Sequence, residues 1–173
     1  APGDVAEVRI VKPMKGYAFG KLEKLLTPGP GRVKQDCPVA GPCGGCGLRH
    51  ISYAAECAAK TQFVRDAFER LAKLDVPVHE VLGAPAADRY RNKVQFPVSR
   101  GKCGLSIGFY RPRSHDVVDT EDCLLQPEAD TALRLAFKGW MEDFQIPAYD
   151  ESTGRGLIRH LYIRTNRAGE ALC

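Results

Sequence analysis

Residues 37–50 read Cys37-Pro-Val-Ala-Gly-Pro-Cys43-Gly-Gly-Cys46-Gly-Leu-Arg-His50, and the rest of the chain is interpreted outward from this stretch. Three thiols fall within ten residues, in a C-x5-C-x2-C spacing. The intervening glycines and prolines predict a tight loop, because glycine lets the backbone turn where bulkier residues would clash. Thiolates held this close together are typical ligands of one metal centre. The stretch therefore predicts a metal-binding loop.

Three thiols leave one ligand missing, since zinc and iron–sulfur sites usually bind four. The candidates for the fourth are Cys57, Cys103, Cys123, Cys173 and His50. We favour Cys123, because it follows the end of a predicted strand, whereas Cys57 falls in a predicted helix and Cys103 in a predicted hairpin turn. We interpret Cys57, Cys103 and Cys173 as ordinary buried or incidental thiols.

The identity of the metal stays open between two alternatives. Zinc ribbons generally supply a second close pair of ligands, and the sequence has no second C-x2-C. An iron–sulfur cluster with one remote thiolate therefore fits the spacing better than a zinc ribbon does. A structural zinc site remains the alternative.

Charge is segregated along the chain, although the formal net charge is only +4. Seven Lys and Arg residues and no acid lie between Arg89 and His115, and four more arginines without an acid lie between Arg155 and Arg167. Residues 121–151, between these segments, are predominantly acidic. This pattern indicates a face that meets polyanions, with a solvated sheet surface as the alternative.

Length and cysteine usage limit the class of protein. The 173 residues suffice for one domain with a core and a small appendage. Seven cysteines without a secretory signal favour a reducing compartment and metal chemistry over a disulfide framework. Because there is no apolar run near 18 residues, we expect a cytoplasmic protein without a membrane partner. Nothing in the sequence indicates an obligate protein partner.

The chain before and just after the cysteine loop predicts two strands and a helix. Residues 5–11 partly alternate in polarity, and residues 21–26 form a second strand that Pro28 and Gly29 end. We expect the tail of a small β-barrel whose beginning is absent. After the loop, Ser52 is the expected N-cap of a helix that runs to about Leu74. The apolar stripe expected to pack on a sheet consists of Cys57, Thr61, Val64, Phe68 and Leu71.

From residue 90 onward the sequence predicts antiparallel strands and a second helix. Tyr90, Val94, Phe96 and Val98 alternate with Arg91, Lys93 and Gln95, which predicts a half-buried strand with a basic face. A turn at residues 99–102 and a strand at 105–110 complete a hairpin, and residues 117–118 begin another strand. Pro127 begins a helix. Its expected buried stripe is Leu133, Ala136, Trp140 and Phe144. A last strand covers residues 157–164, with a turn at 166–169.

These elements predict an α+β fold. Residues 1–35 form a partial OB-like β segment. Residues 36–173 form a central domain of antiparallel strands with two main helices and the cysteine-rich loop. Because the last predicted strand breaks off, we expect the chain to be part of a longer protein.

Several motifs resemble the RNA uracil-5-methyltransferase family, most closely its bacterial 23S ribosomal RNA enzymes that carry an iron–sulfur cluster. They are the cysteine loop, Tyr90-Arg-Asn-Lys-Val-Gln-Phe-Pro97, Ile107-Gly-Phe-Tyr-Arg111, Ser114-His115 and Asp122-Cys123-Leu124. Residues 2–20 resemble the second half of the TRAM domain of these enzymes, an OB-like barrel that binds RNA. The resemblance covers essentially the whole chain in the same order.

The resemblance implies a [4Fe–4S] cluster held by Cys37, Cys43, Cys46 and Cys123. It also implies that the longer protein transfers a methyl group from S-adenosylmethionine to C5 of a uridine, through attack of a cysteine thiolate on C6 of the flipped base. The methyl-donor site and the nucleophile of the family belong to a domain that would follow Cys173. We therefore assign no catalytic residue and expect this segment alone to be inactive.

The RNA-binding surface is expected on the basic strand face and the basic loop that follows the hairpin. Its residues are Arg89, Arg91, Lys93, Gln95, Lys102, Arg111, Arg113 and His115. The alternative function is a non-catalytic RNA-binding module with a structural zinc site. A radical methylthiotransferase is ranked lower, because its C-x3-C-x2-C pattern is missing from the sequence.

Overall fold

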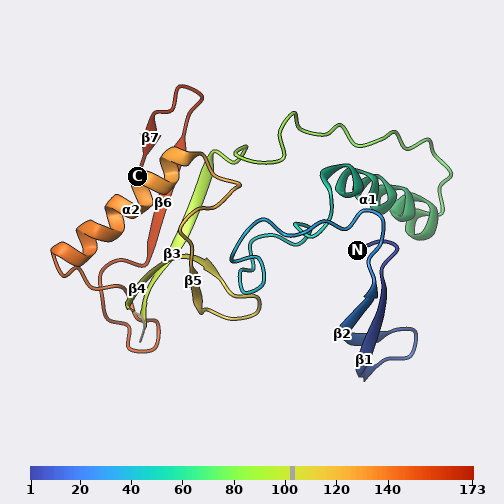
Figure 1. Ribbon diagram of the computed structural model, residues 1–173, viewed down its shortest axis with the longest axis horizontal. Helices are drawn as coiled ribbons and strands as arrows, with labels where there is room; N and C mark the ends of the chain where they lie inside the picture. Colours follow the sequence, from blue (N-terminus) through green and yellow to red (C-terminus); the bar gives the residue numbers. More distant parts are fainter. Residues whose placement is uncertain (102–103) are drawn as a thin grey trace. The chain divides into compact units, whose positions relative to one another are not determined.

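The computed structural model describes residues 1–101 and 104–173. The chain divides into two compact units (Figure 1). Unit 1 comprises Ala1–Gln35 and Leu48–Gly83, and unit 2 comprises Asp36–Gly47 and Ala84–Cys173. The first helix thus shares a unit with the N-terminal strands, while the division into functional domains at residue 35 stays a prediction. None of the helices among the described residues is long and apolar enough to cross a membrane.

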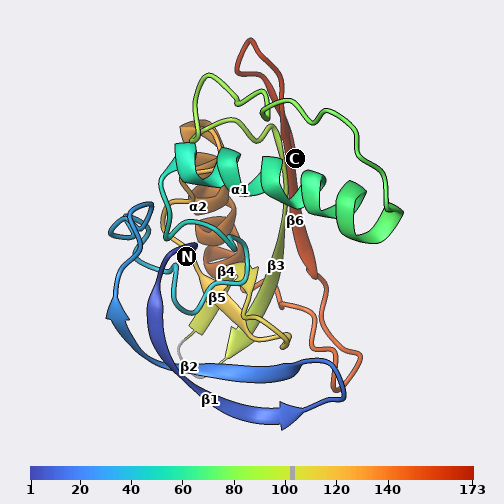
Figure 2. The same ribbon diagram turned by 90° about the vertical axis from the view of Figure 1, so that its right-hand side faces the viewer.

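Unit 1 contains a two-stranded antiparallel ribbon of β1 (Val5–Pro13) and β2 (Ala18–Thr27), which confirms both predicted strands. Figure 2 shows the two strands side by side over their length. Val5, Val8 and Ile10 are each more than half exposed, because a two-stranded ribbon has too little surface to bury a core. The assignment of this ribbon to a TRAM domain stays a prediction.

The predicted helix of unit 1 is present as α1 (Tyr53–Asp66), continued by a π-helical turn, η1 (Ala67–Ala72). The hydroxyl of Ser52 accepts a hydrogen bond from the N–H of Ala55 at 3.3 Å, which confirms the predicted N-cap. Lys73 adopts a left-handed backbone conformation, and its N–H bonds to the carbonyl of Phe68. The helix therefore ends at the residue before Lys73.

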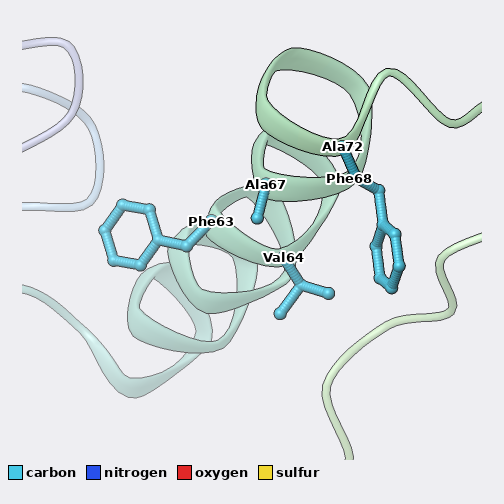
Figure 3. Close-up of a pocket in the computed structure, with 5 residues that line it drawn as sticks. All are labelled: Phe63, Val64, Ala67, Phe68 and Ala72. Atoms are coloured by element: carbon cyan, nitrogen blue, oxygen red, sulfur yellow. The ribbon is translucent and has the colours of Figure 1, made fainter.

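The expected apolar stripe of this helix is covered only at its N-terminal end. Thr61 is buried, whereas Phe68 is 38% exposed and Leu71 is 83% exposed. The expectation that the whole stripe packs on a sheet is wrong, because β1 and β2 pair only with each other and present no broad sheet. Figure 3 shows the side chains that border an apolar hollow of about 430 Å³ along α1 and η1. They are Phe63, Val64, Ala67, Phe68 and Ala72.

Unit 2 is built on a five-stranded sheet with the strand order β5-β4-β3-β6-β7, in which all neighbours are antiparallel. The strands are β3 (Lys93–Gly101), β4 (Gly104–Tyr110), β5 (Val117–Asp119), β6 (His160–Thr165) and β7 (Ala171–Leu172). The mixed fold with antiparallel strands and two helices confirms the predicted fold class in outline. Cys103, expected in the β3–β4 turn, lies outside the described residues.

The core of unit 2 lies between this sheet and α2 (Glu128–Asp143). Val94, Phe96 and Val98 are buried as the alternation predicts, and Leu161 and Ile163 of β6 join them. Tyr90, expected on the same buried face, is 57% exposed. That expectation is wrong because β3 begins only at Lys93, so the alternation does not extend back to residue 90.

Helix α2 follows Pro127 as predicted, but it buries a different face from the expected one. Its buried residues are Asp130, Arg134 and Met141, whereas Ala136, Trp140 and Phe144 are exposed. The expected stripe is confirmed at Leu133, which is partly buried against the core, and is wrong at the other three positions, because two charged residues find partners inside the unit. Thr165 donates to the carboxylate of Asp130 at 2.5 Å. Arg134 donates to the carbonyl oxygens of Ile107 and Glu121 at 3.3 and 2.7 Å.

Candidate metal centre and nucleic-acid interface

The cysteine loop folds as two successive turns that dock on the end of β4. The N–H of Ala40 bonds to the carbonyl of Cys37 at 3.2 Å, and the N–H of Cys43 bonds to that of Val39 at 2.9 Å. The N–H of Gly44 then donates to the carbonyl of Tyr110 at 3.0 Å. A Cβ atom on Gly44 would lie 2.7 Å from this same oxygen, so the approach requires glycine.

Cys123 lies in the connection between β5 and α2 and is brought near the cysteine loop. Burial raises the pKa of its thiol, and the charges of Cys37 and Cys43 raise it further. The backbone N–H groups of Leu125 and Gln126 bond to this thiol and act in the opposite direction. The thiol of Cys123 therefore interacts electrostatically with two of the three loop thiols, while its role as a remote ligand stays a prediction.

The cysteine loop also provides a donor to sulfur. The N–H of Gly45 lies 3.3 Å from the Sγ atom of Cys43, and Cys46 is exposed. Across residues 1–101 and 104–173, however, no group of three or more His, Cys, Asp or Glu side chains is arranged so that it could hold a metal ion. The three loop thiols and Cys123 thus belong to the same unit, but they form no closed ligand set among the described residues.

The other cysteines lie elsewhere in the chain. Cys57 is half-buried on α1 of unit 1, and Cys173 is exposed at the end of the chain. His50, also in unit 1, has a pKa below its usual value because burial disfavours the imidazolium. The assignment of the four cluster ligands stays a prediction.

Arg89, one of the expected RNA-binding residues, is bonded within the chain. Its Nη1 atom donates to the carbonyl oxygens of Cys123 and Gln126 at 3.2 and 3.0 Å. Its own N–H bonds to the carbonyl of Leu124 at 2.8 Å. The structure therefore gives Arg89 a role in shaping the connection that carries Cys123, which the sequence did not indicate.

The remaining basic candidates lie on β3 and on the β4–β5 loop. Lys93 and Gln95 are exposed on the sheet, and Arg91, just before β3, is half-buried. Arg111 and Arg113 are exposed in the loop, which is closed by a 2.8 Å bond from the N–H of Arg111 to the carbonyl of Asp116. Lys102 lies outside the described residues.

His115 ends this loop in a small network that the sequence analysis did not foresee. Its ring stacks on Tyr110, with centroids 5.1 Å apart, and its Nδ1 atom lies 2.5 Å from the carboxylate of Glu151. Glu151 also accepts a hydrogen bond from Arg159 at 2.7 Å, and these two partners hold its pKa below the usual range. The guanidinium of Arg159 lies over the ring of Tyr149. Glu151, Arg159 and Tyr149 are distant in sequence from His115, so only the fold joins them.

No protein-family model matches the chain. The chain is 44% identical over 163 residues to a protein of Clostridium tetani named an uncharacterized RNA methyltransferase, and 43% identical over 164 residues to one of the same name from Bacillus cereus. Each match covers 94% of this chain but only 35% and 36% of the relative. The chain therefore spans about a third of the length of these relatives.

A solved structure has a similar fold. It is the tRNA (uracil-54, C5)-methyltransferase of Pyrococcus abyssi in complex with S-adenosyl-L-homocysteine. The TM-score is 0.69 at 24% identity, and the match covers 99% of this chain and 38% of that chain. The chain thus has the fold of one part of that enzyme, and its sequence is similar, over nearly its whole length, to one part of bacterial proteins named RNA methyltransferases.

Proposed function

We propose that this chain is the RNA-binding and cluster-holding part of an enzyme that transfers a methyl group from S-adenosylmethionine to C5 of a uridine in 23S ribosomal RNA. The observation that carries the proposal is the 44% identity, over 94% of the chain, to a protein named an RNA methyltransferase. The choice of a uridine is supported by the sequence motifs and by the name of the structural neighbour. We place the enzyme in the cytoplasm.

Within this enzyme, Cys37, Cys43, Cys46 and Cys123 hold a [4Fe–4S] cluster. The chemistry of the donors fits, because cysteine thiolates are the usual ligands of such clusters and N–H donors to sulfur stabilise the charged form. Such donors are present at Cys43 and Cys123. When bound, the cluster would link the cysteine loop to the β5–α2 connection. Zinc in the same site is the alternative.

The RNA is held by Arg91, Lys93 and Gln95 together with the β4–β5 loop. The exposure of Lys93, Arg111 and Arg113 supports this role, because exposed cations can neutralise RNA phosphates and release the counterions bound to them. The chain's own residues bind and orient the RNA, and no residue of it takes part in bond making. We expect the segment alone to neither bind the methyl donor tightly nor methylate RNA.

The metal content tests the cluster assignment. Iron, acid-labile sulfide and zinc per chain are measured after anaerobic purification, together with the visible spectrum, for the parent chain and for Cys123→Ala. Cys57→Ala is the matched control, because this half-buried thiol lies on α1. About four irons and four sulfides per chain, reduced in Cys123→Ala only, support the proposal. One zinc per chain in a colourless protein would contradict the cluster assignment and support the zinc alternative.

Methyl transfer is tested separately. The chain is incubated with radiolabelled S-adenosylmethionine and unmodified 23S ribosomal RNA, next to a longer protein in which a catalytic domain follows it. Methylation is expected only with the longer protein. Transfer of label by the chain alone would overturn the proposal that it lacks the catalytic site.

A further inference from the structure

The face of the unit 2 sheet opposite the core carries exposed side chains from β3 and β6. Lys93 pairs with Arg164 and Gln95 pairs with Tyr162 in the antiparallel register. Residues directly opposite each other in such a pair point to the same face of the sheet. Their neighbours Val94 and Ile163 are buried in the core, so these four side chains face outward. We call Lys93, Gln95, Tyr162 and Arg164 the β3–β6 ladder.

One rung of this ladder joins two like charges. Lys93 and Arg164 lie directly opposite each other, an arrangement that destabilises a sheet unless an anion lies between them. Arg89 and Arg159 each have a carboxylate within 4 Å, but in the part of the chain that the structure describes no ion pair involves Lys93 or Arg164. A negatively charged ligand would satisfy both cations.

The neighbouring rung offers groups that suit a nucleobase. Tyr162 leaves 39% of its surface exposed, and Gln95 presents an amide beside it. Arg164 also lines a groove of about 440 Å³, whose other polar lining residues include Asn92 and Asn166. The acid in this groove, Glu170, accepts a hydrogen bond from Asn166 at 2.7 Å. Two cations, a ring and the amide of Gln95 therefore lie on one face of the sheet.

We propose that the β3–β6 ladder binds a single-stranded segment of RNA. Phosphates lie between Lys93 and Arg164, and a base stacks on Tyr162, since single strands are held by basic grooves with aromatic stacking surfaces. An anionic membrane is a poorer fit, because lipid surfaces are recognised by clusters of roughly 4–8 cations. The inference rests on the proposed function and extends it to β6, whose Tyr162 and Arg164 are not among the RNA-binding residues predicted from the sequence.

The test measures binding of a fluorescent oligouridylate of about 12 nucleotides by anisotropy at several salt concentrations. The variants of the 173-residue chain are Lys93→Ala with Arg164→Ala, and Tyr162→Ala. As a control, Arg65→Ala on α1 combined with Arg70→Ala on η1 removes the same amount of charge from unit 1. Tyr162→Phe keeps the ring, and Arg164→Lys keeps the charge. Melting temperatures confirm that each variant is folded.

In the Lys93→Ala/Arg164→Ala variant, the slope of the logarithm of the binding constant against the logarithm of the salt concentration is expected to become shallower. The change is roughly 0.7 for each phosphate that the protein no longer neutralises. Tyr162→Ala is expected to weaken binding roughly five- to hundredfold. Tyr162→Phe, Arg164→Lys and the Arg65→Ala/Arg70→Ala control are expected to bind as the parent does. If the ladder variants bind RNA like the parent, the β3–β6 ladder is not an RNA-binding site, and the proposed function is unaffected. A parent chain without RNA affinity would overturn both.

Competition with heparin and with anionic vesicles identifies the class of ligand. RNA binding is expected to resist both competitors at equal charge concentration, because neither supplies a base to stack on Tyr162. Equal displacement by heparin, together with no effect of Tyr162→Ala, would make the ladder a general polyanion site and overturn the assignment to RNA.

Discussion

Arg89 holds Asp122 with both ends of its guanidinium group. Nη1 lies 2.8 Å from Oδ1 and Nη2 lies 2.6 Å from Oδ2, a bidentate geometry that lysine cannot reproduce. Thr131 of α2 donates to the same carboxylate at 2.9 Å. Arg89 itself has a left-handed backbone, with φ of 55°, which is uncommon outside glycine. Arg89 therefore connects the segment before β3 to residues that precede and follow Cys123 in the sequence, Asp122 and Gln126.

Arg89→Lys is expected to loosen the proposed cluster site without removing any of its four proposed ligands. The variant keeps the charge but loses the bonds to Asp122 and to the carbonyl of Cys123, so the thiol is held less firmly. Replacing such supporting groups typically weakens metal binding about 10- to 100-fold. The measurement is the rate at which iron is lost to a chelator. Arg91→Lys is the control, and equal rates in the two variants would contradict the role given to Arg89.

Acid is expected to weaken the fold partly through Asp122. The hydrogen bond from Arg89 is the main cause that holds the pKa of Asp122 below its ordinary value of 3.8. Because the folded pKa is depressed, this carboxylate stabilises the fold above pH 3.8, and its contribution is lost as the pH falls through the folded value. In Asp122→Asn, the free energy of unfolding should therefore fall less steeply as the pH is lowered below about 4. Asp143→Asn, on the exposed end of α2, serves as the control.

Gly44→Ala is expected to destabilise unit 2. The added Cβ would meet the carbonyl oxygen of Tyr110 at 2.7 Å, which forces the cysteine loop away from β4. Overpacking of this kind costs roughly 1–3 kcal/mol. In the same loop, a Cβ on Gly41 would meet nothing within 4 Å, so Gly41→Ala is the matched control. Urea unfolding checks the difference, and equal midpoints for the two variants would show that the loop is free to move.

Local patterns predict most elements of this chain, because they depend on residues close in sequence. The hydroxyl of Ser52 identifies the start of α1, and the alternation of Val94, Phe96 and Val98 identifies the buried face of β3. The pairing of β3 with β6 cannot be read in the same way, since β4, β5 and α2 lie between the two strands in the sequence. The ladder partner of Lys93 therefore emerges only from the fold.

In the candidate site too, features that depend on nearby residues can be predicted, and features that depend on distant residues cannot. The C-x5-C-x2-C spacing predicts the loop, and the position of Cys123 after a strand predicts its approach to that loop. The bonds of Arg89 could not be predicted, because they depend on a left-handed backbone and on carbonyl oxygens more than 30 residues away. The burial of polar residues such as Asp130 could not be predicted from hydrophobic periodicity for the same reason, because their bonding partners are distant in sequence.

The buried face of α2 yields a test in which sequence and structure give opposite results. Met141 is fully buried, and Met→Ala in a core costs about 2–5 kcal/mol. Trp140 is 41% exposed and touches only the rings of Phe137 and Phe144 among the aromatic contacts of the described residues. Trp140→Ala should therefore cost less, about 0.5–1.5 kcal/mol for each of the two ring pairs that it removes.

Urea unfolding measures both variants, followed by circular dichroism because Trp140 is the chain's single tryptophan and its removal abolishes the fluorescence signal. Met141→Ala is expected to have the lower midpoint. The hydrophobic pattern alone, with Trp140 in the buried stripe, gives the reverse order. A lower midpoint for Trp140→Ala would mean that this side of the helix is covered in solution, and that the packing of α2 described above is incorrect.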